Sequence, residues 1–179
     1  MTKKRQRWSP TRIGVISDTH GYLDPDALRA LRGVSHIIHA GDIVDGATLD
    51  RLRAVAPLTA VAGNLDDGDL AAGLPREATG VVDRVCFAVG HKRKRLLKRI
   101  AAGKVQPPKD GGPFDLIVFG HEHVPSAVWV DGVLHLNPGT ASSPDEEDDG
   151  PTLAVVEARA TGLNVRLVPL PRRFDGPSR

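Results

Sequence analysis

The stretch Gly120-His121-Glu122-His123 follows directly on an apolar run, Phe114-Asp115-Leu116-Ile117-Val118-Phe119. A short apolar run of this kind is typical of a buried strand. Two histidines separated by one residue, just past the end of that strand, can turn both imidazoles toward one point. This arrangement suits metal binding, but the spacing alone is equally consistent with two ordinary loop histidines. The rest of the chain decides between these interpretations.

The first third of the chain places further polar side chains at strand ends. Three short apolar runs are predicted to be strands, each with a glycine nearby and each followed by a side chain that can bind a metal. Helices are predicted from Pro25, with Asp24 as the N-cap, and over residues 47–55. The three runs cover residues 12–17, 35–39 and 58–62, and they lead into Asp18-Thr19-His20-Gly21, Ala40-Gly41-Asp42 and Gly63-Asn64-Leu65-Asp66.

Alternating strands and helices favour parallel strand pairing. In parallel sheets, ligands bind at the carboxyl ends of the strands. Several side chains of this sequence fall at that edge, and their coincidence favours a shared metal site far more strongly than any single motif. The side chains are Asp18, His20, Asp42, Asn64, His121 and His123.

The second half of the chain is predicted to be rich in hairpins. One hairpin turns near Asp83, and another turns at Asp131-Gly132, a dipeptide that is a strong hairpin signal. An acidic surface loop is expected at residues 145–149. The predicted elements are strands at 78–82, 84–89, 126–130, 133–136, 152–157 and 163–168, and a helix at 92–102.

Length and composition are those of a soluble globular protein. The 179 residues are 40% hydrophobic and 26% charged, which suffices for one domain with a sizeable core. We expect that domain at residues 12–170, between a flexible basic tail at 1–11 and a loose C-terminal tail at 171–179. The net charge of +2 is too small to argue for nucleic-acid binding by itself.

Cysteine usage and hydropathy favour a cytoplasmic location. Cys86 is the single cysteine, so an internal disulfide framework is excluded and a reducing compartment fits. No apolar run approaches the roughly 20 residues that a membrane span needs. The basic N-terminal segment also lacks the apolar core of a signal peptide. The sequence therefore predicts a cytoplasmic protein that does not bind membranes.

The helix predicted at 92–102 is strongly basic, and two interpretations of it compete. Its cationic side chains could bind nucleic acid or a phosphorylated substrate, because the helix begins beside His91. Alternatively, they form a solvated face while Leu96, Leu97 and Ile100 pack inward. The solvated face is preferred, so nucleic acid is not a favoured partner. Arg93 and Arg95 are retained as candidate contacts for a substrate phosphate.

The ordered motifs Asp18-x-His20, Gly41-Asp42, Gly63-Asn64 and Gly120-His121-x-His123 resemble those of the calcineurin-like metallophosphoesterases. The short chain and the segment Asn137-Pro138-Gly139-Thr140 are similar to the small bacterial YfcE-type phosphodiesterases of that superfamily. The resemblance covers nearly the whole domain. It implies an α/β (α+β) fold in which two mixed β-sheets pack as a sandwich flanked by helices, in four layers. It also implies a metal-dependent phosphoesterase, most simply a phosphodiesterase that acts on a phosphate ester.

The resemblance assigns a role to each motif residue. Asp18, His20 and His123 would hold a first metal ion, Asn64 and His121 a second, and Asp42 would bridge the two. Asp42 and His20 would be the catalytic residues, acting with a metal-activated hydroxide, and Asn64 and His91 would contact the substrate. These oxygen and nitrogen ligands suit one or two divalent ions, manganese first and zinc, iron or magnesium as alternatives.

Two positions depart from the family pattern. Val89 stands where the family's His-Gly-His motif has its first histidine, and valine cannot bind a metal. Three interpretations follow: His91 swings in, water or substrate fills a weakened second site, or the protein binds one metal or none tightly. The weakened second site is preferred. Leu65 replaces a histidine that serves as the general acid in nuclease members, which favours esters with good leaving groups.

A second function class competes with the enzyme. The same fold includes a retromer subunit that resembles these enzymes but serves mainly as a scaffold for protein partners. Val89 gives weight to such a degenerate, weakly active or inactive scaffold. The six intact motif residues argue for the enzyme, because a scaffold has no chemical need for them. An exposed apolar patch away from the site would favour the scaffold.

Overall fold

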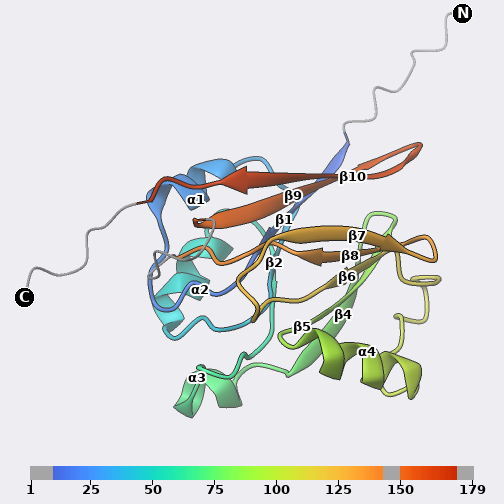
Figure 1. Ribbon diagram of the computed structural model, residues 1–179, viewed down its shortest axis with the longest axis horizontal. Coiled ribbons are helices and arrows are strands. Elements are labelled where there is room, and N and C mark those ends of the chain that lie inside the picture. The colour runs from blue at the N-terminus through green and yellow to red at the C-terminus, as the bar shows by residue number, and fades with distance from the viewer. Residues whose placement is uncertain (1–9, 143–149, 173–179) are drawn as a thin grey trace, which may run out of the picture.

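The computed structural model describes residues 10–142 and 150–172. Within these residues, ten strands form two five-stranded sheets of order β10-β9-β1-β2-β3 and β4-β5-β6-β8-β7, accompanied by four helices (Figure 1). The elements are β1 (Thr11–Ile16), α1 (Pro25–Ala30), β2 (His36–His39), α2 (Gly46–Arg53), β3 (Leu58–Ala60), α3 (Gly68–Ala72), β4 (Glu77–Val82), β5 (Val85–Gly90), α4 (Arg93–Ala101), β6 (Leu116–Val118), β7 (Ser126–Val130), β8 (Val133–Asn137), β9 (Thr152–Arg159) and β10 (Gly162–Pro169).

The first sheet is parallel on one side and antiparallel on the other. Strands β1, β2 and β3 pair in parallel, β9 pairs antiparallel with β1, and β10 pairs antiparallel with β9. Helices α1 and α2 cover its outer face, where Leu31 and Leu52 pack against Ile16 and Ile37. Asp24 caps α1 as predicted, because its carboxylate accepts a hydrogen bond from the Asp26 N–H and Pro25 occupies the first helical position.

The second sheet is also mixed. Strands β5, β6 and β8 pair in parallel, and β4 and β7 close its two edges as antiparallel hairpin partners. Both hairpins turn where the sequence predicts, with Asp83 at φ 56° and Asp131 and Gly132 at φ 49° and 82°. Helix α4 covers the outer face of this sheet through Leu96, which packs in a cluster with Ile117 and Phe119.

The main core lies between the two sheets. Val15 of β1, Phe87 of β5 and Val118 of β6 belong to this one buried cluster. Every residue of β5 is buried, because one face of the strand meets the opposite sheet and the other meets α4. The predicted four-layer sandwich of two mixed sheets flanked by helices is confirmed.

Some predictions need correction or fall outside the described residues. Strand–helix alternation predicted parallel pairing correctly, but the parallel strands are divided between two sheets. Helix α3 was not predicted, and its five residues bury no side chain. The acidic loop at 145–149 lies outside the described residues, as does most of each predicted tail. No helix in the described ranges is long and apolar enough to cross a membrane.

Loops from both sheets are tied together where the parallel strands end. The His121 N–H, after β6, donates to Asp18 Oδ2, after β1, at 3.1 Å. The His91 Nδ1, after β5, lies 2.8 Å from the Ala40 carbonyl oxygen, after β2. The predicted ligand-bearing loops are therefore brought to one end of the sandwich.

Candidate metal centre

The backbone at this end of the sandwich is held in an uncommon conformation. Among the described residues, eight non-glycine positions have a positive φ, and five of these eight are predicted metal ligands. Side chains other than glycine rarely adopt this region, and such strain concentrates at functional sites. The five residues are Asp18, His20, Asp42, His121 and His123, with φ between 47° and 74°.

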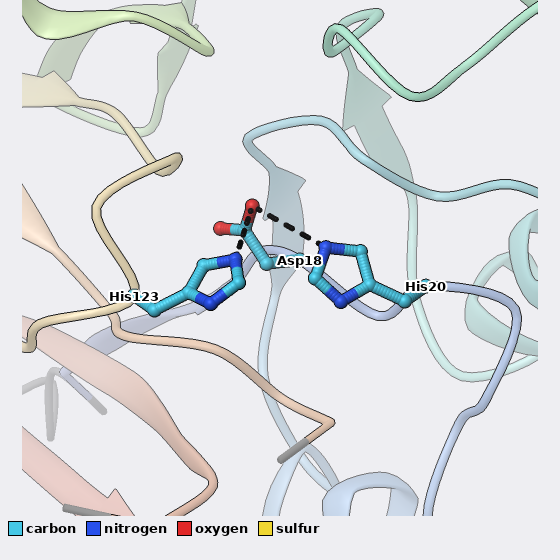
Figure 2. A group of neighbouring side chains, drawn as sticks. All are labelled: Asp18, His20 and His123. Atoms are coloured by element: carbon cyan, nitrogen blue, oxygen red, sulfur yellow. Dashed lines mark ion pairs between the residues drawn. The ribbon is translucent and has the colours of Figure 1, made fainter. Parts of the chain in front are cut away.

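A first group of candidate ligands consists of Asp18, His20 and His123 (Figure 2). One ligand atom from each lies within 4.8 Å of the others. Asp18 Oδ1 lies 3.5 Å from His123 Nε2 and 4.0 Å from His20 Nε2. Figure 2 shows both imidazoles turned toward this one carboxylate oxygen. The structure therefore brings together the three residues that the sequence predicts for a first metal ion.

A second group consists of Asp42, His91 and His121, again with ligand atoms within 4.8 Å of one another. His91 Nε2 lies 3.3 Å from Asp42 Oδ2 and 3.2 Å from the amide oxygen of Asn64. The rings of His91 and His121 have centroids 5.1 Å apart. Asn64 and His121, the predicted ligands of a second metal, thus lie next to His91.

Asp42 lies between the two groups. Its Oδ2 is 3.8 Å from His20 Nε2 in the first group and 3.3 Å from His91 Nε2 in the second. Its other oxygen, Oδ1, accepts a hydrogen bond from the Leu65 N–H at 2.8 Å. This position between the groups is the one that a bridging carboxylate requires.

His91 belongs to the second group of candidate ligands, whereas Val89 does not. The Val89 side chain is 0% exposed and belongs to the core between the sheets, whereas His91 is 4% exposed and faces the second group. The Nδ1–H of His91 donates to the Ala40 carbonyl, which leaves Nε2 directed at Asp42 and Asn64. The sequence alone had favoured a second site that water or substrate fills. The geometry instead favours the interpretation in which His91 swings in.

Asp66 joins the loops that carry Asp42 and Asn64. Its Oδ1 accepts from the N–H groups of Ile43 and Val44, and its Oδ2 accepts from the Gly63 N–H, each at 2.7 Å. Asp66 is therefore a structural residue of these loops. The sequence did not reveal that one carboxylate would hold both loops.

Ser142 is a supporting residue that sequence reasoning missed. Its hydroxyl donates to the Asp18 carbonyl at 3.0 Å and lies 3.3 Å from His20 Nδ1. Thr140 donates to the same carbonyl at 2.9 Å, so this residue also lies beside the candidate centre. No motif around Ser142 signals this role, because the contact spans 122 residues.

Two glycines of the motifs are explained by close approach. A Cβ on Gly63 would lie 2.0 Å from Asp42 Oδ1, and a Cβ on Gly120 would lie 2.0 Å from Ser17 Oγ and 2.6 Å from Asp18 Oδ2. Any side chain at either position would displace a carboxylate of the centre. The glycine before Asn64 and the glycine before His121 thus make room for the ligands of neighbouring loops.

Electrostatics keep the shared carboxylate ionised. Burial alone would raise the pKa of Asp42, but hydrogen bonds from His20, His91 and the Leu65 N–H outweigh it and hold the pKa well below its usual range. Burial likewise disfavours the charged form of His91, yet Asp42 and Asp18 raise the pKa of His91 overall. The negative charge of Asp42 and Asp18 therefore favours a cation between the candidate ligands.

The residues present fit divalent cations. Asp18 Oδ1 and His20 Nε2 are buried and have no hydrogen-bond partner among the described residues, although polar atoms in this position are normally paired. The candidate ligands are carboxylates, an amide oxygen and imidazoles, with no thiolate. This donor set is compatible with several first-row metals and does not select one of them.

Comparison with known proteins identifies a family model and named relatives. The calcineurin-like phosphoesterase superfamily domain matches residues 11–161. A probable metallophosphoesterase of Methanocaldococcus jannaschii is 33% identical over 143 residues, or 74% of this chain and 69% of that protein. Another, from Methanothermobacter thermautotrophicus, is 27% identical over 170 residues, or 87% and 91%.

Solved structures share the fold. A predicted phosphoesterase from Streptococcus pneumoniae superposes with a TM-score of 0.68 at 23% identity, covering 90% of this chain and 91% of that one. An archaeal phosphodiesterase gives 0.68 at 22% identity, covering 88% and 100%. Zinc-complexed Vps29 from Entamoeba histolytica gives 0.64 at 18% identity, covering 88% and 98%. At these identities the likeness concerns the fold alone.

Proposed function

The chain belongs to the calcineurin-like phosphoesterase superfamily, and we propose on this premise that it is a metal-dependent phosphodiesterase. One observation carries the proposal. Two groups of candidate ligands, three residues each, lie at the ends of parallel strands from both sheets, with Asp42 between them. Such a pair of sites is the arrangement that two-metal hydrolysis of phosphate esters requires.

The proposed ligand set includes one change from the family pattern. Asp18, His20 and His123 would hold the first ion, and Asn64, His91 and His121 would hold the second, with Asp42 shared. His91 would thereby take the place of the histidine that Val89 replaces. Manganese is the first candidate, and zinc, iron and magnesium are the alternatives.

The ions would supply a hydroxide nucleophile near neutral pH and neutralise charge on the phosphoryl oxygens. The chain's own residues orient this chemistry. The ionised Asp42 offsets repulsion between two cations. The Ala40 carbonyl fixes the His91 tautomer, and Ser142 contacts the far side of the His20 ring. Outer contacts of this kind orient the ligand rings.

The leaving group receives little help from the residue after Asn64. Leu65 is 55% exposed and offers no proton, although its N–H holds Asp42. Esters with good leaving groups, which do not need protonation, are therefore the proposed preference.

A scaffold role is the second candidate. Strand β7 lies at the edge of the second sheet and exposes Val128, Trp129 and Val130. Exposed apolar side chains on an edge strand favour protein contacts. The buried ligand atoms without hydrogen-bond partners in the described residues favour the enzyme, because they serve no purpose in a scaffold.

The test is a metal-dependence assay. Purified protein is stripped with a chelator, manganese, zinc or magnesium is restored, and hydrolysis of bis-p-nitrophenyl phosphate is followed. We expect turnover to return with metal and to vanish in Asp42→Ala. Folded wild-type protein that shows no turnover with any metal would instead support the scaffold.

A further inference from the structure

A cavity of about 200 Å³ adjoins the second group of candidate ligands. Asn64 and His91 line one side of it. Three cationic side chains, Arg76, Lys92 and Arg95, also line it, and Arg76 is steadied by a hydrogen bond from Nη1 to the Gly63 carbonyl at 3.2 Å. The space next to the proposed centre is therefore suited to anionic groups of a substrate.

The positive surface continues away from this cavity along α4. A wider hollow of about 450 Å³ is lined by Lys94, Lys98, Arg99 and Lys104, and Arg95 lines both hollows. We call this combined surface the basic track. It is lined by Arg76, Lys92, Lys94, Arg95, Lys98, Arg99 and Lys104.

The net charge of the whole chain hides how uneven its charge is. Residues 84–109 contain nine of the 24 Lys and Arg residues and none of the 22 Asp and Glu residues. The remainder carries 15 basic and 22 acidic residues, so acidic residues outnumber basic ones outside this segment. Proteins that bind nucleic acid concentrate positive charge in this way.

Glu77 compensates only part of this charge. It pairs with Arg95 at 2.7 Å and with Arg99 at 3.2 Å. In the part of the chain that the structure describes, no ion pair is found for Lys94, Lys98 or Lys104, all of which are exposed. The outer half of the track therefore keeps its excess positive charge.

A merely solvated helix does not explain this composition. Burial of Leu96 accounts for the apolar side of α4. Exposure to solvent does not explain why every charged residue on the other side of the helix is basic, since acidic side chains would be solvated equally well. Lys94 with Lys98, and Arg95 with Arg99, are like charges at i and i+4, which destabilise a helix. Cations in the first turn also oppose the helix dipole. These unfavourable charge interactions occur in the helix that lies next to the proposed centre, which suggests that the basic residues serve a function there.

We propose that the basic track binds the backbone of a single-stranded nucleic acid and presents one of its phosphodiesters to the metal centre. The choice of nucleic acid among polyanions rests on the proposed phosphodiesterase function. The nine residues of α4 span about 14 Å, enough for roughly two to four consecutive phosphates. No Phe, Tyr or Trp of the described residues lines either hollow, so binding is expected to follow the backbone and not the base sequence.

The test measures binding separately from hydrolysis. Fluorescence anisotropy follows a labelled oligothymidylate of about 12 nucleotides in the presence of chelator, which prevents cleavage. The variant Lys94→Gln/Lys98→Gln/Lys104→Gln is compared with Arg32→Gln/Arg51→Gln/Arg166→Gln, which removes three exposed charges elsewhere. We expect at least tenfold weaker binding for the first variant and less than twofold for the second.

Salt dependence and thermal stability supply two further readouts. Loss of three phosphate contacts should reduce the slope of log Kd against log salt concentration by about 2. The melting temperature of the lysine variant should equal or exceed that of wild type, because like-charge repulsion along α4 is relieved. A fall in melting temperature would contradict the charge argument for α4.

Other outcomes overturn the proposal cleanly. Equal losses of oligonucleotide affinity in both variants would show general electrostatic attraction instead of binding along the basic track. Wild-type protein that does not bind the oligonucleotide would refute nucleic-acid binding by the basic track. Polyglutamate that competes as well as the oligonucleotide would indicate an acidic protein partner. Turnover of bis-p-nitrophenyl phosphate without oligonucleotide binding refutes the track alone. Track-dependent binding without any turnover refutes the phosphodiesterase alone.

Discussion

The two groups of candidate ligands differ in how they are assembled. In the first group, Asp18, His20 and His123 all stand at positions that the motifs specify. In the second group, Asp42 and His121 do so, but the third residue, His91, stands two positions after the expected one. In each group, nevertheless, the candidate ligand atoms lie within 4.8 Å of one another.

The difference teaches that a side chain two residues further along can reach the same candidate site when it keeps the same direction. In a strand, residues two apart point to the same face. Val89 lies in β5 and His91 directly follows Gly90, the last residue of the strand. Both side chains point toward the first sheet, because Val89 packs in the core between the sheets and His91 contacts the Ala40 carbonyl. Val89 fills the core there, and His91 lies one step beyond, where the core ends and the candidate site begins.

Among variants that affect only one of the two groups, removal of the central carboxylate of the first group should have the largest effect. We expect Asp18→Asn to lower kcat/KM for bis-p-nitrophenyl phosphate by about 1,000-fold, a loss of about 4 kcal/mol of transition-state stabilisation. Steady-state kinetics and metal content by atomic emission measure the loss. Asp50→Asn, on the exposed side of α2, is the matched control. Wild-type kinetics in Asp18→Asn would remove the first group from the mechanism.

Breaking the second group should cost less and should distinguish His91 from Val89. We expect His91→Ala to lower activity by about 10- to 100-fold and to weaken one of two bound ions, because a ligand is lost while Asp42 remains. Val89→Ala should instead cost about 2 kcal/mol of folding stability by opening a core cavity, with metal content unchanged. Titration calorimetry and denaturant unfolding separate the two. Metal loss in Val89→Ala, or unchanged metal content in His91→Ala, would contradict the assignment of His91 to metal binding and of Val89 to the core.

The smallest effect is expected from a residue that supports a ligand. Ser142→Ala should weaken metal binding at the first group by about three- to tenfold, because the His20 ring loses its outer contact while Thr140 still holds the Asp18 carbonyl. The second group has no equivalent variant, since a backbone carbonyl holds His91. Ser126→Ala on β7 is the control. A loss confined to the second ion would contradict the assignment.

Much of the fold could be predicted because its signals are local. The Asp24-Pro25 helix start and the Asp131-Gly132 hairpin depend on residues that are adjacent in sequence. Helix α3 could not be predicted, because it buries no side chain and therefore leaves no apolar periodicity to detect. The division of the strands into two sheets came from family resemblance, since strand–helix alternation alone does not reveal how many sheets form.

The sequence by itself determined which residues stand at the strand ends: two aspartates, an asparagine and three histidines, each near a glycine. The tertiary structure decided three further matters. It placed His91 against Ala40, 51 residues away, used Asp66 to join two loops, and set the basic face of α4 beside the candidate site. The physical reason is that motif positions follow from local chain direction, whereas these contacts join segments that lie far apart in sequence and meet only in the folded chain.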